Sequence, residues 1–379
     1  MNIKEEITGA INRVEDLGQM MLRNPKVAAD LIPSAVKGYV LQQGKNDTIG
    51  IVSPHKTFYD WTYSNEGNPA FRELYRKAYR GQWNAEDLPW DTNVDPENMG
   101  DLAILPEKLH PMYGSKYYSK DPKHNMREMH DVYGFLLSQF LHGEQGALYA
   151  AGMTVEATPW FGAKLYGATQ VVDEGRHVEV FAKYIIEKLE RLYHVNDNLF
   201  VVIHALNSSP DWDIKFLGMQ IMIEGLALGA FGLFYKYTKE PLLKNLLKLV
   251  ISDEARHVHY GVEALRDYYT KEVSDKLRKD REDWAYEVAV LLRNRFMFYE
   301  IREKYYGDKI SREEWERTIM NSEIMKEFRR SLFTRLIPNL KAIGLLTDRI
   351  RPHYEKLGVI EYETMKAADK LSLSELLAA

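Results

Sequence analysis

The stretch LGMQIMIEGLALGAFGLF, residues 217–234, places one acid, Glu224, in an otherwise apolar run whose only other polar side chain is Gln220. A buried ionised carboxylate is costly unless a partner charge or a metal offsets its lost hydration. The run is long enough to suggest a membrane span, but an acid lies in its middle and the chain has no second run of this kind. We therefore expect the central helix of a large bundle, in which Glu224 faces a partner.

The partners of Glu224 emerge from a repeat. Residues 173–177 read DEGRH and residues 253–257 read DEARH, 80 residues later; Glu144 precedes Glu174 by the same 30 residues that separate Glu224 from Glu254. A Glu and a His three residues apart share one helix face and can bind one metal. A spacing of this length lets the chain follow one helix, turn, and return to the same level. The repeat predicts one convergent set: Glu144, Glu174, His177, Glu224, Glu254 and His257.

Four carboxylates and two imidazoles suit two divalent metals that share bridging carboxylates. A single Glu-x-x-His is a weak signal. Two copies in register, each preceded by an acid in an apolar helix, are a specific one. The alternative is a set of buried acids satisfied only by hydrogen bonds, and buried acids are rarely arranged in register.

This pattern resembles the ferritin-like di-iron carboxylate superfamily, over about residues 130–270. Its members include multicomponent monooxygenase hydroxylases, ribonucleotide reductase small subunits, acyl-carrier-protein desaturases and arylamine N-oxygenases. The resemblance implies that four further residues hydrogen-bond around the metal ligands, and the alternative is that they form ion pairs on helix surfaces. These residues are Asp173, Arg176, Asp253 and Arg256.

The chain departs from each familiar subfamily. Ribonucleotide reductase small subunits typically begin with an Asp ligand and often carry a radical Tyr where this chain has Phe181. Multicomponent hydroxylases commonly place Thr where Leu228 stands, and arylamine N-oxygenases add a His where Val250 stands. The closest subfamily therefore stays open, as do the roles of Gln145 and Gln170, which lie near the ligand rows.

The expected fold is all-α: a ferritin-like four-helix bundle with additional N- and C-terminal helices. We divide the chain into an N-terminal helical and irregular segment (1–127), the bundle (128–271) and C-terminal helices (272–379). Thr158-Pro159 and Ser209-Pro210 are typical of helix starts, and Ser311 with Glu314 forms a capping box. Helices are expected at about 3–23, 26–43, 70–82, 127–157, 159–193, 210–238, 240–271, 273–306 and 311–330.

Composition narrows the chemistry. The chain has no cysteine, which excludes disulfides, thiolate zinc sites and cysteine-ligated iron–sulfur clusters. Its net charge of −5 gives no sign of nucleic-acid binding. The N-terminus carries acids where a signal peptide needs basic residues, so we expect a cytoplasmic protein without a membrane span.

Two functions follow from the resemblance and the ligand set. The first is a non-heme di-iron monooxygenase or oxidase that uses O2 for hydroxylation, desaturation or N-oxygenation of a hydrophobic or acyl substrate. The metals would be two Fe ions, although a Mn/Fe pair takes the same ligands. No dinucleotide or P-loop motif occurs, so an external ferredoxin or flavin reductase would supply electrons. The second is a ferroxidase that handles iron without an organic substrate. A homodimer is a fold-level expectation.

Overall fold

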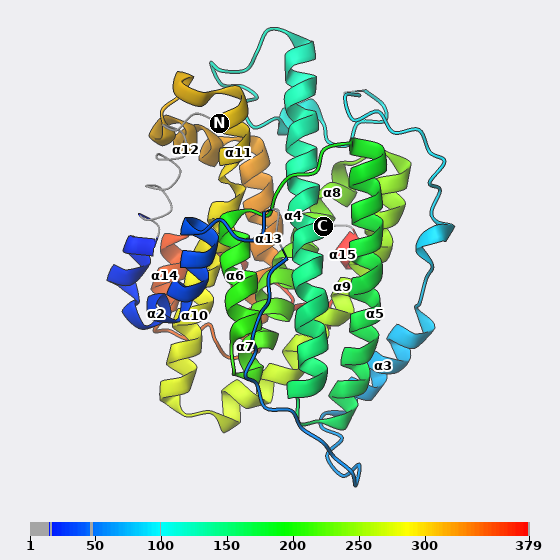
Figure 1. The fold of residues 1–379 in the computed structure, drawn as a ribbon, viewed down its shortest axis with the longest axis vertical. Coiled ribbons are helices and arrows are strands. Elements are labelled where there is room, and N and C mark those ends of the chain that lie inside the picture. The colour runs from blue at the N-terminus through cyan, green and yellow to red at the C-terminus, as the bar shows by residue number, and fades with distance from the viewer. Residues whose placement is uncertain (1–14, 16, 46–47, 99, 378–379) are drawn as a thin grey trace.

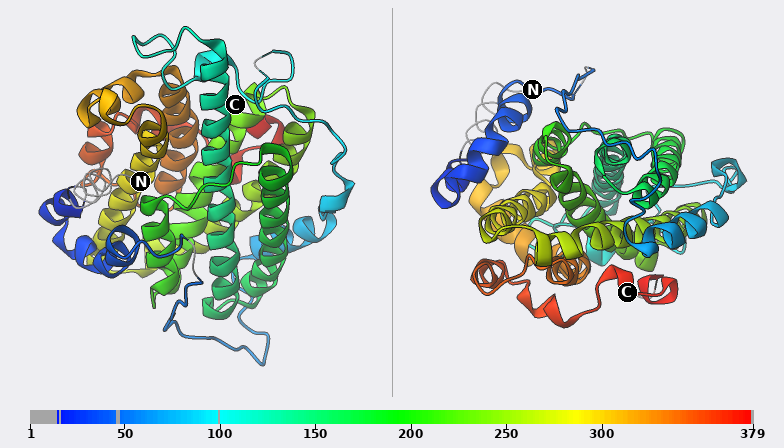
Figure 2. Two further views of the ribbon diagram at one scale, coloured as in Figure 1. Left: turned by 45° about the horizontal axis from the view of Figure 1, so that its top comes forward. Right: turned by 90° about the horizontal axis from the view of Figure 1, so that it is seen from below.

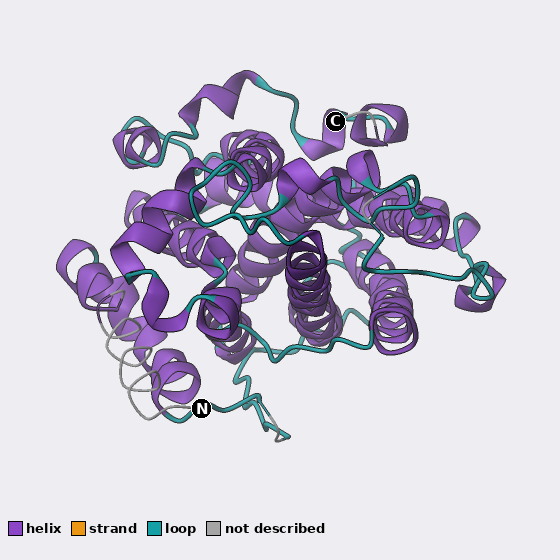
Figure 3. Ribbon diagram, turned by 90° about the horizontal axis from the view of Figure 1, so that it is seen from above, coloured by secondary structure: helices purple, strands orange, loops and turns teal. Residues whose placement is uncertain are grey.

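The computed structural model describes residues 15, 17–45, 48–98 and 100–377. Within these ranges the protein consists of helices and loops and contains no strand (Figure 3). The all-α prediction is therefore confirmed for the part of the chain that is described. Most of the helix predicted at 3–23 lies outside it.

Fourteen α-helices are described, together with short segments of wider or tighter helical turn. The α-helices are α2 Pro25–Ala35, α3 Pro69–Arg80, α4 Pro122–Ala157, α5 Phe161–Lys183, α6 Asp197–Ser208, α7 Trp212–Phe216, α8 Glu224–Tyr237, α9 Pro241–Asp267, α10 Asp275–Asn294, α11 Tyr299–Tyr305, α12 Arg312–Asn321, α13 Glu323–Ala342, α14 Arg351–Lys356 and α15 Leu373–Leu377. The π-helical segments are η1 Val36–Val40, η4 Tyr184–Leu189, η5 Leu217–Ile223 and η6 Tyr268–Glu272. The 3₁₀ segments are η2 Ala85–Asp87, η3 Glu107–Leu109, η7 Arg295–Met297, η8 Gly307–Lys309, η9 Ile360–Thr364 and η10 Ala368–Lys370.

The long helices lie in layers. The antiparallel helices α4 and α5 pack side by side, and the pair α8 and α9 lies behind them (Figure 1). The C-terminal segment, with α13 directly against α8, covers the side of this second pair that faces away from α4 and α5 (Figure 2). The helices α4, α5, α8 and α9 thus carry the repeat and stand together near the middle of the molecule. The division at residues 127 and 271 stays a prediction, although α4 begins at Pro122 and crosses the first boundary.

Helix starts and breaks depart locally from the pattern. α5 begins at Phe161 and α7 at Trp212, two residues after the prolines that mark the predicted starts. Neither Thr158 nor Ser209 is the N-cap residue. At α12 Ser311 is the N-cap residue, as predicted: the backbone N–H of Glu314 donates to the Ser311 hydroxyl at 3.2 Å, and the Glu314 carboxylate pairs with Lys116.

The helix that contains Glu224 is continuous from Trp212 to Tyr237 and consists of α7, η5 and α8. It is the one described helix long and apolar enough to cross a membrane, yet 94% of its most apolar 18-residue window is buried inside the structure. That burial is typical of a core helix. The wide π-turns of η5 end at Ile223, directly before Glu224, and such turns occur frequently at functional sites.

The α2–α6 contact contains a buried histidine, and it predicts a pH effect. His204 Nε2 lies 3.1 Å from Lys37 Nζ, and its Nδ1 lies 2.8 Å from the Ser34 hydroxyl. Burial, together with the Lys37 charge, lowers the pKa of His204 to about 4 from its usual 6.5. Between pH 6.5 and pH 4 the unfolded chain therefore binds a proton at His204 that the folded chain does not bind. The contribution of neutral His204 to the free energy of unfolding is complete above pH 6.5 and is lost as the pH falls from 6.5 towards 4.

We expect the urea midpoint of the native chain to fall between pH 7.5 and pH 5 by more than that of His204→Asn, which has no such proton to bind. Urea unfolding of both proteins at the two pH values measures the difference. An equal fall in both proteins would show that His204 contributes nothing to it.

Candidate metal centre

The six residues of the repeat meet in the core. Glu144 comes from α4, Glu174 and His177 from α5, Glu224 from α8, and Glu254 and His257 from α9. All six are buried, the most exposed being Glu144 at 4%. Their ligand atoms form two overlapping groups, in each of which the atoms lie within 4.8 Å of one another. The first group contains Glu144, Glu174, His177 and Glu254, and the second contains Glu174, Glu224 and His257.

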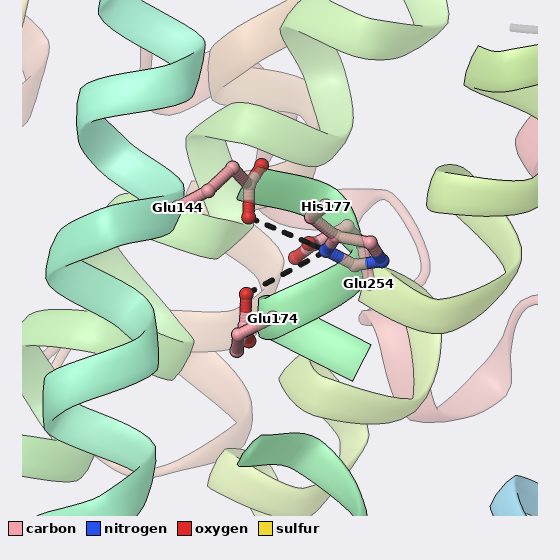
Figure 4. A group of neighbouring side chains, drawn as sticks. All are labelled: Glu144, Glu174, His177 and Glu254. Atoms are coloured by element: carbon pink, nitrogen blue, oxygen red, sulfur yellow. Dashed lines mark hydrogen bonds and ion pairs between the residues drawn. The ribbon is translucent and has the colours of Figure 1, made fainter. Parts of the chain in front are cut away.

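His177 occupies the middle of the first group (Figure 4). Its Nδ1 lies 3.3 Å from Glu144 Oε2, 3.5 Å from Glu174 Oε2 and 3.1 Å from Glu254 Oε1. In the second group His257 Nδ1 lies 3.1 Å from Glu174 Oε1 and 3.7 Å from Glu254 Oε2. Each of the two central glutamates therefore turns one oxygen towards each imidazole, which is the placement expected of bridging carboxylates.

The aspartates of the repeat cross between the two motifs. His177 Nε2 lies 3.2 Å from Asp253, and His257 Nε2 lies 3.3 Å from Asp173. A carboxylate accepts hydrogen bonds and so holds a proton on each Nε2, which directs each Nδ1 towards the glutamates. Asp173 and Asp253 thus each lie within hydrogen-bonding distance of the imidazole of the other motif, and a role around bound metal stays a prediction.

The arginines of the repeat close the outer side of the centre. Arg176 donates to Asp173 at 2.5 Å and to Asp253 at 3.3 Å, and Arg256 donates to Asp253 at 2.5 Å and to Asp173 at 3.2 Å. The two arginines and two aspartates thus form a closed ring with balanced formal charge. Both arginines therefore pair with the aspartates, and neither pairs with one of the four glutamates.

Two residues that the sequence analysis did not identify donate further hydrogen bonds to the aspartates of this ring. Beyond the end of α3, Trp83 donates its indole N–H to Asp253 at 2.8 Å, and Gln82 donates to Asp173 at 3.0 Å. The Arg176 guanidinium also stacks 4.9 Å from the centre of the Trp83 ring. Residues 82 and 83 lie outside the repeat and in no helix, so the sequence carries no pattern that would have singled them out.

Electrostatics at the centre are dominated by burial and by mutual charge. Burial, reinforced by the neighbouring glutamates, raises the pKa values of Glu144 and Glu224 well above the usual range. Burial also acts against charge on His177 and His257, but the surrounding carboxylates outweigh it and raise both pKa values well above normal. For Glu174 the two imidazoles outweigh burial and hold its pKa well below normal. Positive charge is therefore strongly favoured at this point.

Unpartnered atoms provide a test of whether metal fits. The buried atoms Glu174 Oε2, Glu224 Oε2, both carboxylate oxygens of Glu254, and His257 Nδ1 have no hydrogen-bond partner. Buried polar atoms are nearly always satisfied, and those that are not require an explanation. Oxygen and nitrogen atoms that share one small volume are the donor set of iron, manganese or zinc. The clusters could therefore hold a metal ion, and the residues present fit that role.

The two ends of the centre differ in chemistry. At one end, the Phe140 ring lies 6.0, 4.8 and 5.5 Å from the rings of Phe181, Phe231 and Phe234, which form an aromatic cluster. At the other end lie the buried amides Gln170 and Gln220. A cavity of about 530 Å³ lies elsewhere, beside Met20, Tyr286 and Met297, and none of the six residues lines it.

No protein-family model matches the chain, and no curated protein matches it in sequence. Any assignment to a family therefore rests on the residues of the centre and on their arrangement.

Proposed function

We propose that this protein is a non-heme di-iron oxidoreductase that activates O2 on a ferritin-like four-helix bundle. One observation carries the proposal: two Glu-x-x-His motifs, on α5 and α9, meet two further buried glutamates, on α4 and α8, in overlapping ligand groups. This distribution over the four helices is that of the ferritin-like di-iron and di-manganese proteins.

Charge supports two divalent ions. The arginines and aspartates of the ring balance one another, so the four glutamates form a separate group of buried carboxylates. An isolated buried carboxylate is very costly. Two divalent cations would supply as many positive charges as the four glutamates carry negative ones. With all four glutamates ionised, a single divalent ion would balance only half of their charge.

The chain's own residues have separable roles in this proposal. Glu144 with His177 would hold one ion, Glu224 with His257 would hold the other, and Glu174 and Glu254 would contribute to both. Asp173 and Asp253 hold the Nε2 protons, so that each Nδ1 lone pair faces an ion. The bound iron would supply the reduction of O2. The aromatic cluster around Phe140 excludes water from one end, which protects a strong oxidant from side reactions.

The proposed reaction is hydroxylation, desaturation or N-oxygenation of a hydrophobic or acyl substrate, with electrons from an external ferredoxin or flavin reductase. The second candidate is a ferroxidase that stores or transfers iron. Length favours the first candidate, because a ferroxidase needs only the bundle. Here helices that follow the repeat, such as α10 and α13, pack against the helix that contains Glu224 and add a further layer.

The test begins with anaerobic loading of the metal-free protein with Fe(II), followed by counting the bound iron and measuring O2 consumption with a chemical reductant. Glu224→Ala is the comparison variant. We expect about two irons per chain, as the paired ligand groups require, and continued O2 consumption while the iron count stays constant. Glu224→Ala should lose both properties. Ferric iron that accumulates beyond two per chain would favour the ferroxidase, and a protein that binds no iron would refute both candidates.

A further inference from the structure

The two halves of the repeat are not equivalent one turn away from the ligands. Gln170 precedes Glu174 by four residues, and the residue at the same place before Glu254 is Val250. Likewise Gln220 precedes Glu224, whereas Phe140 precedes Glu144. All four residues are buried. The glutamates and histidines of the repeat are therefore the same in both halves, whereas Gln170 and Gln220 have no amide counterpart in the other half.

Gln170 contacts one ligand group only. Its side-chain nitrogen donates to Glu174 Oε1 at 3.0 Å and to Glu224 Oε1 at 2.9 Å. Glu174 Oε1 is the oxygen that faces His257, whereas Glu174 Oε2 faces His177. One hydrogen bond therefore falls on the Glu174 oxygen that faces His257, and the other falls on Glu224, which belongs to the same group.

Gln170 is itself fixed in place. Gln220 donates to the Gln170 side-chain oxygen at 3.3 Å, which directs the Gln170 nitrogen towards the two glutamates. Gly261 leaves the room for Gln220, because a Cβ at that position would lie 2.5 Å from the Gln220 Cβ. The first ligand group has no corresponding amide donor: there Glu144 Oε2 lies 3.3 Å from His177 Nδ1.

We propose that Gln170 is a positioning residue that makes the two metal positions unequal. The ion held by Glu144, Glu174, His177 and Glu254 binds first, and the ion held by Glu174, Glu224 and His257 binds second and more weakly. The physical reason is competition, because an ion at the second position takes over Glu174 Oε1, which the Gln170 amide already binds in the metal-free protein. This inference rests on the proposed function, since it presupposes that the six residues bind metal.

The test is an anaerobic titration with Co(II), whose absorbance reports each ligand environment separately from any activity. The native chain should bind two ions in two resolved steps. Gln170→Val, which installs the residue of the other half of the repeat, should tighten the second step by about tenfold and bring the two steps together, since a hydrogen bond to a charged group is worth roughly that factor. Gln170→Met, which keeps the length of the side chain without its donor, should act in the same direction.

Gln145→Val is the matched control, because Gln145 is exposed on α4 and should leave both steps unchanged. Glu224→Ala should remove the weaker step and Glu144→Ala the stronger one, which assigns each step to its position. An unchanged ratio of the two dissociation constants in both Gln170 variants would overturn the inference, as would a single unresolved step in the native chain. A native chain that binds no Co(II) would refute the metal centre itself.

Discussion

Replacing Glu174 by alanine is expected to abolish both metal-binding steps, whereas loss of Glu144 or Glu224 removes only one. Glu174 is the one residue that belongs to both ligand groups and has both oxygens close to an imidazole. Its removal leaves the first group with one glutamate fewer, and leaves the second position with Glu224, His257 and the more distant Glu254 Oε2, which lies 3.7 Å from His257 Nδ1. Counting metal per chain after gel filtration measures the effect for all three variants.

The same substitution should destabilise the metal-free protein. The pKa of Glu174 lies well below normal because His257 and His177 outweigh its burial, so it is the carboxylate that balances two buried imidazolium groups. Removal of one partner from a buried ion pair costs about 3–5 kcal/mol. Glu174→Gln keeps the shape and one acceptor oxygen but removes the charge, and should lose metal with a smaller loss of stability than Glu174→Ala. A Glu174→Ala protein that still holds two ions would contradict the shared role of Glu174.

The sequence predicted that the six residues converge, because their placement is encoded in the spacing of residues along the helices. A Glu and a His three residues apart must share a helix face, and a repeat spacing of fixed length must return the chain to the same level. The crossing of Asp173 to His257 and of Asp253 to His177 was beyond that reasoning. It depends on how α5 and α9 are rotated about their axes, which no spacing within one helix determines. Trp83 and Gln82 reach the centre from outside the bundle and leave no periodic signal at all.

The same distinction applies to helix boundaries: the sequence predicts those that depend on local patterns and misses those that depend on packing against distant segments. The described helices agree with the pattern where apolar periodicity is long, as in α4 and α9. α6 was not predicted, since its apolar run LFVVI is short and rich in β-branched residues, which local propensity assigns to strands. Its packing against α2 and α4 decides otherwise. The helix expected at 273–306 breaks at Phe298, whose φ of 52° lies in the left-handed region although the residue is not a glycine.

The C-terminal helix α13 packs against α8, and we expect this contact to hold α8 in place. Substitution of Gly229 tests this expectation. Gly229 lies on the face of α8 that meets α13, and a Cβ there would lie 2.3 Å from the Ser331 carbonyl oxygen and 2.8 Å from the Leu332 Cα. Both are backbone atoms, so no side chain can move aside. We expect Gly229→Ala to lower the free energy of unfolding by about 3 kcal/mol, which is the upper end of the usual cost of overpacking. Urea unfolding measures this loss as a lower midpoint.

Gly152→Ala is the matched control, because no atom lies within 4 Å of a Cβ at that helical position on α4. Alanine loses less conformational freedom on folding than glycine does, so this variant should be more stable than the native chain by about 0.5–1 kcal/mol. The comparison also bears on the metal centre, since α8 begins at Glu224 and a displaced α8 moves only that ligand. If α13 holds α8 in register, Gly229→Ala should weaken the second metal-binding step and spare the first. If Gly229→Ala matches Gly152→Ala in stability, α13 yields to the added methyl group and the C-terminal layer does not fix the position of Glu224.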